Sequence, residues 1–270
     1  MMRKNISTKE IKSFYELQGE SGDHQKGMYE SGNIFYRWFQ NRRRTVVESL
    51  IKQCNASTLL DVGCAEGLFI RFLSKDREYS FGVDISKPKL MRAKAYNNNY
   101  DSSFILTDAS CLPFRDNSFD MVICIDVLRY LINLDKAISE LFRVSKKYVI
   151  IQSATDPRKI FSSKIIQRDY SKVKKDFMLN PFDGELWFIS SRALIRFNRH
   201  IDKDFKCSKI IGHFQIFIAL AYRAIPFKHN EKILSKFIWI IEKIDNSLST
   251  NRFFYHLGIF TTVLFKRENL

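Results

Sequence analysis

The apolar residues of this chain gather in short runs separated by helical patterns. Leu134, Ala137, Ile138, Leu141 and Phe142 recur at the spacing of an amphipathic helix. The runs predict buried strands at 59–62, 79–83, 103–109, 121–125, 148–154, 205–213 and 258–265. Because strands and helices alternate through the first five of these, the sequence predicts an α/β protein with a doubly wound sheet.

The segments around this alternation follow other patterns. Residues 34–51 repeat apolar positions at helical spacing, whereas residues 21–32 are polar and predict a loop. Ser86 and Pro88 predict the start of a helix, with the serine as its cap. Residues 157–180 are basic and polar, which predicts a loop or a helix over the site. About 40 residues separate the last two strands and also look helical, although the connection between such strands is normally short.

The stretch from Leu59 to Gly67 carries the clearest chemical signal. A buried strand runs through Gly63 and Gly67 into a helix, so backbone N–H groups can approach a ligand closely. Asp84 ends the second strand seventeen residues later, where a carboxylate can accept both hydroxyls of a ribose. Asp108 ends the third strand in a similar way.

These motifs, in this order, resemble the class I S-adenosylmethionine-dependent methyltransferases, in particular the type 11 branch of ubiquinone and menaquinone biosynthesis enzymes. The resemblance runs from Leu59 to about Ala154. It implies a seven-stranded Rossmann-like sheet with an antiparallel last strand, S-adenosyl-L-methionine as cofactor, and methyl transfer as the activity. It also implies three parts, which are a helical lid at 1–57, a cofactor-binding core at 58–156 and an acceptor-side region at 157–270 with a helical insertion at about 215–256.

The resemblance further implies a role for each motif position. The methionine part of the cofactor would be lined by Asp61, Gly63, Cys64, Ala65 and Gly67. Asp84 would hold the ribose, with Ile85 against the adenine. Asp108 would bond the adenine amino group beside Ala109, and Ile125 would close the other side. Related proteins often have glycine where Ala65 stands, and we expect this alanine to keep a negative φ.

Methyl transfer to a hydroxyl or a carbon also requires a base near the methyl group. Asp126 and Tyr130 follow the fourth strand, and His24 lies in the predicted loop, so these three are catalytic candidates. Asp126 could equally cap the next helix, and Tyr130 stands where related proteins often have histidine. Further candidates for cofactor or acceptor contacts in the lid are Tyr29, Tyr36 and Arg37.

The net charge of +15 is unevenly distributed. The core at 58–156 is neutral, whereas residues 1–57 carry +4 and residues 157–270 carry +11. Basic flanks predict an anionic acceptor or one held at an anionic surface, and the alternative is that the charge serves solubility alone.

The five cysteines are scattered and form no C-x-x-C pair. This pattern predicts reduced thiols in a cytoplasmic protein and no metal site. Because the first residues lack an apolar run, we also expect no signal peptide.

The helical insertion shows two unlike faces. Apolar residues from Ile233 to Ile244 fill one face, and Trp239 falls on the other side among Lys232, Lys236 and Lys243. A tryptophan among lysines suits the interface of an anionic membrane, which for a cytoplasmic protein is the inner membrane face. The alternative is that the apolar face packs on the sheet.

The function expected from these patterns is methyl transfer to a lipophilic or membrane-held small-molecule acceptor. An isoprenoid quinone ring, a polyprenyl-linked sugar or another lipid head would fit. An RNA methyltransferase is an alternative because the flanks are basic and aromatic, although no RNA-binding appendage is recognisable. A non-catalytic cofactor-binding protein is a third reading. A nicotinamide-binding protein is disfavoured because Leu68 stands where its glycine pattern requires glycine.

Overall fold

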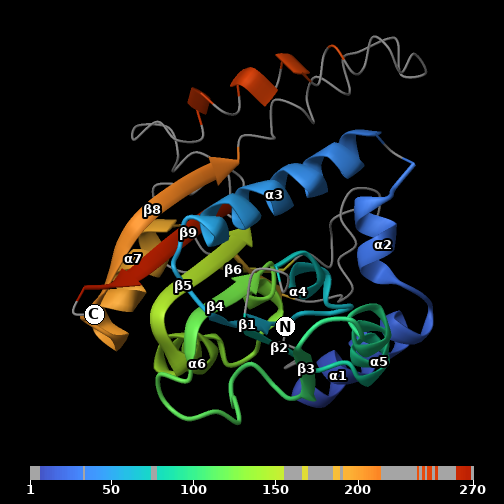
Figure 1. The fold of residues 1–270 in the computed structure, drawn as a ribbon, viewed down its shortest axis with the longest axis horizontal. Helices are drawn as coiled ribbons and strands as arrows, with labels where there is room; N and C mark the ends of the chain where they lie inside the picture. Colours follow the sequence, from blue (N-terminus) through green and yellow to red (C-terminus); the bar gives the residue numbers. More distant parts are fainter. Residues whose placement is uncertain are drawn as a thin grey trace.

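A seven-stranded sheet forms the centre of the computed structural model, in the order β3-β2-β1-β4-β5-β9-β8 (Figure 1). Residues 7–32, 34–73, 78–154, 166–169, 185–188, 191–213, 236, 239–240, 242–244, 247–248 and 260–268 are described. The strands of this sheet are β1 (Thr58–Val62), β2 (Tyr79–Asp84), β3 (Ser102–Leu106), β4 (Phe119–Ile125), β5 (Ser145–Ala154), β8 (Phe205–His213) and β9 (Phe260–Arg267). Strands β3, β2, β1, β4 and β5 pair in parallel, and β9 runs antiparallel between β5 and β8. The predicted sheet, with its antiparallel last strand, is confirmed.

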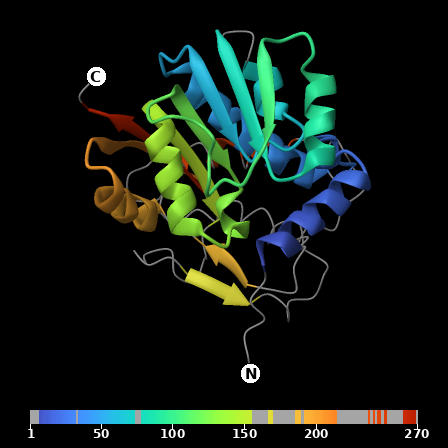
Figure 2. The ribbon, with the colours of Figure 1, turned by 90° about the horizontal axis from the view of Figure 1, so that it is seen from below.

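Both faces of the central strands are buried, which explains their almost continuous apolar sequence. Leu59 of β1 packs with α3 (Ile34–Lys52) and α4 (Leu68–Leu73) on one face. Leu60, the next residue, packs with α6 (Leu134–Val144) and α7 (Ser191–Ile201) on the other. Figure 2 shows α6 and α7 in front of the sheet.

Two N-terminal helices, α1 (Thr8–Glu20) and α2 (His24–Tyr29), precede α3, and α1 lies against α5 (Lys87–Tyr96) (Figure 1). Helix α1 begins with a capping box, in which Ser7 Oγ accepts from Glu10 N at 3.2 Å and Glu10 Oε2 accepts from Ser7 N at 2.7 Å. The prediction of a loop throughout 21–32 is wrong, because the side chain of Asp23 caps α2 by accepting from Lys26 N at 2.7 Å.

The region after β5 contains a second, two-stranded sheet made by β6 (Ile166–Asp169) and β7 (Glu185–Phe188). Strand β7 lies against the short 3-10 helix η2 (Leu128–Tyr130). The prediction of a loop or helix over 157–180 is therefore wrong at β6. Four residues with one apolar position, paired with a strand far along the chain, leave no periodic signal.

The insertion between β8 and β9 is helical at every residue that is described there, namely 236, 239–240, 242–244 and 247–248. Most of its predicted apolar face lies outside the described residues. None of the helices in the described part of the chain has the length and apolar character needed to cross a bilayer.

Candidate cofactor and acceptor site

A cavity of about 200 Å³ lies at the carboxyl ends of the central strands. The chain order reverses between β1 and β4, and open α/β sheets bind ligands at such a reversal. Eight of the residues predicted to hold the cofactor line the cavity, and they are Asp61, Gly63, Ala65, Asp84, Ile85, Asp108, Ala109 and Ile125. The three catalytic candidates His24, Asp126 and Tyr130 line it as well.

The turn after β1 depends on left-handed backbone conformations. Gly63 has φ +79°, and a Cβ added there would lie 2.2 Å from Val127 Cγ2, so a side chain cannot fit. Ala65 has φ +47°, which contradicts the expected negative value. A left-handed alanine costs about 1 kcal/mol. In this conformation Ala65 N donates a hydrogen bond of 2.9 Å to Asp84 Oδ2, which offsets part of that cost.

Two predicted cofactor residues, Cys64 and Gly67, lie behind the turn and are not among the described residues that line the cavity. Cys64 is buried against Ile70 and Leu90. A Cβ on Gly67 would lie 2.7 Å from Asn97 Nδ2, so this glycine lets the turn approach the end of α5. Both residues therefore contribute to the packing of the turn.

Asp84, at the end of β2, is oriented by backbone donors. Its Oδ2 accepts from Ala65 N and its Oδ1 accepts from Ser86 N, both at 2.9 Å. A carboxylate oxygen can accept a further bond, so both oxygens can still receive the hydroxyls of a ribose. The side chain of Ser86 does not cap α5, contrary to expectation, because its hydroxyl donates to Tyr15 O on α1 at 2.9 Å.

Asp61 provides a test of whether the cavity fits S-adenosylmethionine. Its side chain is 2% exposed, and its Oδ2 has no hydrogen-bond partner among the described residues. Burial, and secondarily the charge of Asp84, raises the pKa of Asp61 to about 8. A buried carboxyl oxygen of this kind fits the ammonium of the cofactor's methionine part, just as Asp84 fits its ribose. When bound, the cofactor supplies an electrophilic methyl group on a sulfonium.

Cofactor affinity should therefore rise with pH between 6 and 8. Below pH 8 the Asp61 carboxyl is mostly protonated in the free protein, whereas the ammonium of the ligand favours the carboxylate, so binding releases a proton. The limit is about a tenfold gain per pH unit for one proton. Calorimetry with S-adenosylhomocysteine in buffers of different ionisation enthalpy measures this release. Asp61→Asn should remove it, and equal affinities at pH 6 and 8 in the unmodified protein would contradict the assignment.

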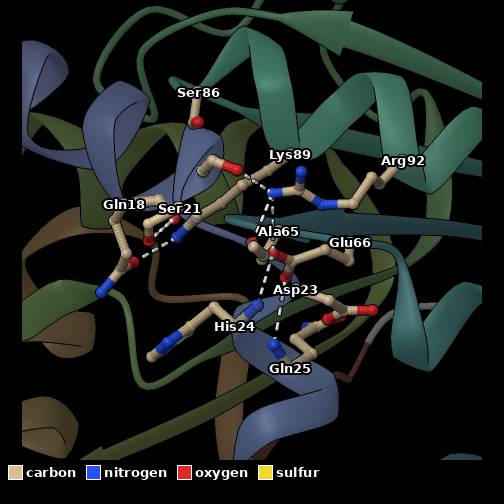
Figure 3. A network of polar contacts seen from close by, with 12 residues as sticks. Gln18, Ser21, Asp23, His24, Gln25, Ala65, Glu66, Ser86, Lys89 and Arg92 are labelled. Atoms are coloured by element: carbon tan, nitrogen blue, oxygen red, sulfur yellow. Dashed lines mark hydrogen bonds and ion pairs between the residues drawn. The ribbon is translucent and has the colours of Figure 1, made fainter.

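Helices α1 and α2 contribute residues to the lining of the cavity, and polar contacts join α2 to the turn after β1 (Figure 3). Gln25 Nε2 donates to Cys64 O at 3.2 Å, and Gln25 Oε1 accepts from Leu68 N at 3.0 Å. The buried carboxylate of Glu66 accepts from His24 N at 3.0 Å and from Gln25 N at 3.4 Å. No sequence pattern indicates Gln25 or Glu66, since these contacts join residues about 40 positions apart.

Asp126 follows the end of β4 and lines the cavity. Its φ is +60°, and its buried Oδ1 accepts no hydrogen bond from the described residues. Arg43 Nη2 lies 3.4 Å from Asp126 Oδ2, and Arg129 Nη1 lies 3.9 Å from Asp126 Oδ1. Asp126 does not cap η2, whose N-cap is Val127. Strained backbone at a non-glycine residue beside a cavity is typical of a functional position.

Arg43, on α3, also lines the cavity, although no sequence pattern predicts it as a site residue. Its Nε donates to Gln152 Oε1 at 2.9 Å, and its Nη1 donates to Gln40 Oε1 at 3.1 Å. In a run of three arginines, nothing in the sequence separates this buried side chain from its neighbours. The two glutamines fix the guanidinium where it meets Asp126.

The pKa values of the other two catalytic candidates, His24 and Tyr130, shift in opposite directions. Burial, followed by the charge of Lys89, lowers the pKa of His24 to about 4, so its imidazole is neutral at pH 7 and holds a proton weakly. Burial raises the pKa of Tyr130 to about 12, so its hydroxyl remains a donor. The ring of Tyr130 meets Tyr15 of α1 edge to face, with centroids 6.0 Å apart.

Of the three remaining candidates in the N-terminal segment, one is among the residues that line the cavity. Tyr29 lines the cavity. Tyr36 stacks on Phe39 and Arg37 donates to Ser31 O at 2.8 Å, and neither residue is among the described ones that line it. Among the residues that the structure describes, no group of histidine, cysteine and acidic side chains gathers that could hold a metal ion.

Comparison with known proteins bears on the identity of this site. A family model described as "Methyltransferase domain" matches residues 60–151. The chain is 37% identical to the 18S rRNA (guanine-N(7))-methyltransferase of Mus musculus over 81 residues, covering 30% of this chain and 28% of that one. It is 28% identical to the malonyl-[acyl-carrier protein] O-methyltransferase of Buchnera aphidicola over 183 residues, covering 66% and 71%. The chain spans 62% and 28% of the lengths of the first two curated relatives that it matches.

A solved structure shares the fold. Magnesium protoporphyrin IX methyltransferase of Synechocystis, with bound S-adenosylhomocysteine, matches with a TM-score of 0.61 at 15% identity. The match covers 97% of this chain and 100% of that one. The family model covers the strands and turns that build the cavity, and the sheet order is that of the predicted fold. Residues 60–151 therefore form a methyltransferase domain, within a sheet that has the fold of the class I S-adenosylmethionine-dependent methyltransferases.

Proposed function

We propose that this protein transfers a methyl group from S-adenosylmethionine to a lipophilic small-molecule acceptor. The observation that carries the proposal is the set of aliphatic and aromatic side chains that line the cavity in addition to the predicted cofactor residues. They include Ile11, Tyr15, Met28, Tyr130, Leu131 and Ile132. A cavity whose exposed surface is mostly apolar suits a small organic molecule, and the covering helices α1 and α2 help to exclude water from the transfer.

The polar groups of the cavity supply the chemistry that a protonated acceptor needs. Asp126 Oδ1, to which no described residue donates a hydrogen bond, can accept one from an acceptor hydroxyl or amine. The neutral imidazole of His24 can accept a hydrogen bond from the acceptor, and the Tyr130 hydroxyl can donate one. In-line transfer requires mainly that the nucleophile be positioned.

The relatives favour an acceptor other than RNA. The match to malonyl-[acyl-carrier protein] O-methyltransferase covers 66% of the chain, whereas the match to the rRNA methyltransferase covers 30%. RNA remains the second candidate because that relative acts on rRNA by name and residues 157–270 carry +11. A non-catalytic role is disfavoured, since Asp61, Asp84 and Asp108 all line the cavity.

Transfer of a labelled methyl group decides between these acceptors. Tritiated S-adenosylmethionine is incubated with the protein and either a total lipid extract or a total RNA preparation. Label in the organic phase supports the proposal. Label in RNA with none in lipid would replace it with the RNA alternative, and no label in either would leave a protein that binds cofactor without transfer.

The exposed helix residues of the insertion support an acceptor held at a membrane. Trp239, Ile240 and Ile244 are 57%, 48% and 51% exposed. Lys243 Nζ lies 3.8 Å from the centroid of the Trp239 ring. Exposed indole and isoleucine side chains beside lysines suit peripheral contact with an anionic leaflet, at the cytoplasmic side of the inner membrane.

Replacing Lys236 and Lys243 by glutamine should weaken binding to anionic vesicles by about thirtyfold. Each lysine near such a surface contributes about 1 kcal/mol, and salt should weaken the contribution. Co-sedimentation with phosphatidylserine vesicles measures the change. The matched control is Lys52→Gln with Lys94→Gln, two exposed lysines on α3 and α5. If the unmodified protein stays in the supernatant at low salt, the membrane proposal fails while the acceptor proposal stands.

A further inference from the structure

Lys89 is a lysine in an unusual position. It lies on α5 with 3% of its surface exposed. It lines the same cavity as Asp84, whose carboxylate is the predicted ligand of the ribose. Its Nζ donates to Gln18 Oε1 on α1 at 2.6 Å and lies 4.7 Å from the centroid of the Tyr15 ring (Figure 3). A buried ammonium costs free energy unless its partners compensate, so an apolar residue of the same length would pack more favourably here.

The charges around Lys89 come from several elements. Burial raises the pKa of Asp84, and the ammonium of Lys89 opposes that rise. Burial lowers the pKa of Lys89, and the carboxylates of Asp84 and Glu66 oppose that fall. The other titratable or charged groups that face this pair are Tyr15 on α1, His24 on α2, Asp61 on β1, Cys64 in the turn and Arg92 on α5.

We propose that Lys89 is a positioning residue for the cofactor. Lys89 links the closure of α1 over the cavity to the ionised state of Asp84. One hydrogen of its ammonium holds Gln18, and its charge keeps the ribose-binding carboxylate charged where water is excluded. The proposal rests on the assignment of this cavity to S-adenosylmethionine. If α1 moved away from the cavity, water would enter and Gln18 would no longer hold the Lys89 side chain. Closure of α1 and binding of the ribose therefore favour each other.

Other contacts also hold α1 and α2, so loss of Lys89 should leave the protein folded. Arg92 Nη2 donates to Gly19 O and, at 2.7 Å, to Gly22 O, and lies 3.7 Å from Glu66 Oε1. Ser86 Oγ donates to Tyr15 O. These bonds attach the N-terminal segment to α5 independently of the ammonium, and Figure 3 shows Arg92 beside Glu66.

The test compares Lys89→Met with Lys87→Met, which removes an exposed lysine from the same helix. Titration calorimetry with S-adenosylhomocysteine is run at pH 6, 7 and 8. Lys89→Met should bind about tenfold more weakly at pH 7, the equivalent of one pKa unit of coupling. Its loss should grow toward pH 6, because Asp84 protonates at a higher pH without Lys89. Asp61 titrates in both variants, so the difference between their pH profiles isolates the effect of Lys89.

Hydrogen exchange and a second variant separate the two roles. Amides of α1 and α2 should exchange faster in Lys89→Met, with the strands unchanged. Gln18→Leu should speed exchange in the same helices and leave the pH profile like that of Lys87→Met. If Lys89→Met matches Lys87→Met in affinity, pH profile and exchange, the proposal is overturned. If Lys87→Met binds no S-adenosylhomocysteine at any pH, the cofactor assignment itself has failed.

Discussion

Replacing Asp84 by alanine should weaken S-adenosylhomocysteine binding by at least about a hundredfold. A ribose diol would give the carboxylate two charge-assisted hydrogen bonds, each worth about 1.5–3 kcal/mol, so even the lower values together amount to about 3 kcal/mol. The variant also loses the acceptors of Ala65 N and Ser86 N, which loosens the turn that faces the ligand. Calorimetry at pH 8, where about half of the Asp61 carboxyl is ionised, measures the loss.

The matched control for this change is Asp101→Ala. Asp101 is an exposed acid just before β3, so its removal changes the net charge equally without touching the cavity. The control should bind like the unmodified protein. An Asp84→Ala protein that is folded by circular dichroism and keeps full affinity would show that the ribose is held elsewhere.

Replacing Gly63 by alanine should lower the stability of the protein by about 3 kcal/mol. A left-handed φ costs about 1–2 kcal/mol for a residue with a Cβ, and forced overpacking costs about 1–3 kcal/mol. Here φ is +79° and the new Cβ would lie 2.2 Å from Val127 Cγ2. For a protein of this size the melting temperature should fall by roughly 10 °C.

A double variant separates the two causes. Val127→Ala removes the colliding methyl groups, so adding it to Gly63→Ala should restore part of the lost stability and leave the cost of the positive φ. Val127→Ala alone gives the reference for its own lost packing. Gly63→Ala melting at the temperature of the unmodified protein would mean that the turn has another conformation.

The cofactor end of the site could be predicted because it is local in sequence. Asp61, Asp84 and Asp108 each lie at or just beyond the carboxyl end of a parallel strand, and parallel strands in a doubly wound sheet end at the same edge. Apolar runs identified the strands, so they also identified the edge. Strand ends shifted by a few residues, as at β5, which begins at Ser145, three residues before its predicted start.

What the sequence did not reveal depends on contacts between distant segments. Lys89 is buried by α1, and Glu66 is buried by α2, whereas both residue types are ordinarily exposed. The positive φ of Ala65 accompanies its bond to Asp84, nineteen residues away. In each case the docking of the N-terminal helices or the closing of the turn outweighs the preference of the single residue.

The position of β9 has a consequence for the order in which the site is completed during synthesis. Residues 58–154 contain the turn and the acids that line the cofactor end, so this part can assemble early. Gln152, which fixes Arg43, receives its own support from Thr262 of β9, 110 residues later, at 2.9 Å. Strand β9 must also enter between β5 and β8. A nascent chain should therefore form the cofactor end of the cavity before β9 is present to hold Gln152, and with it Arg43, in place beside Asp126.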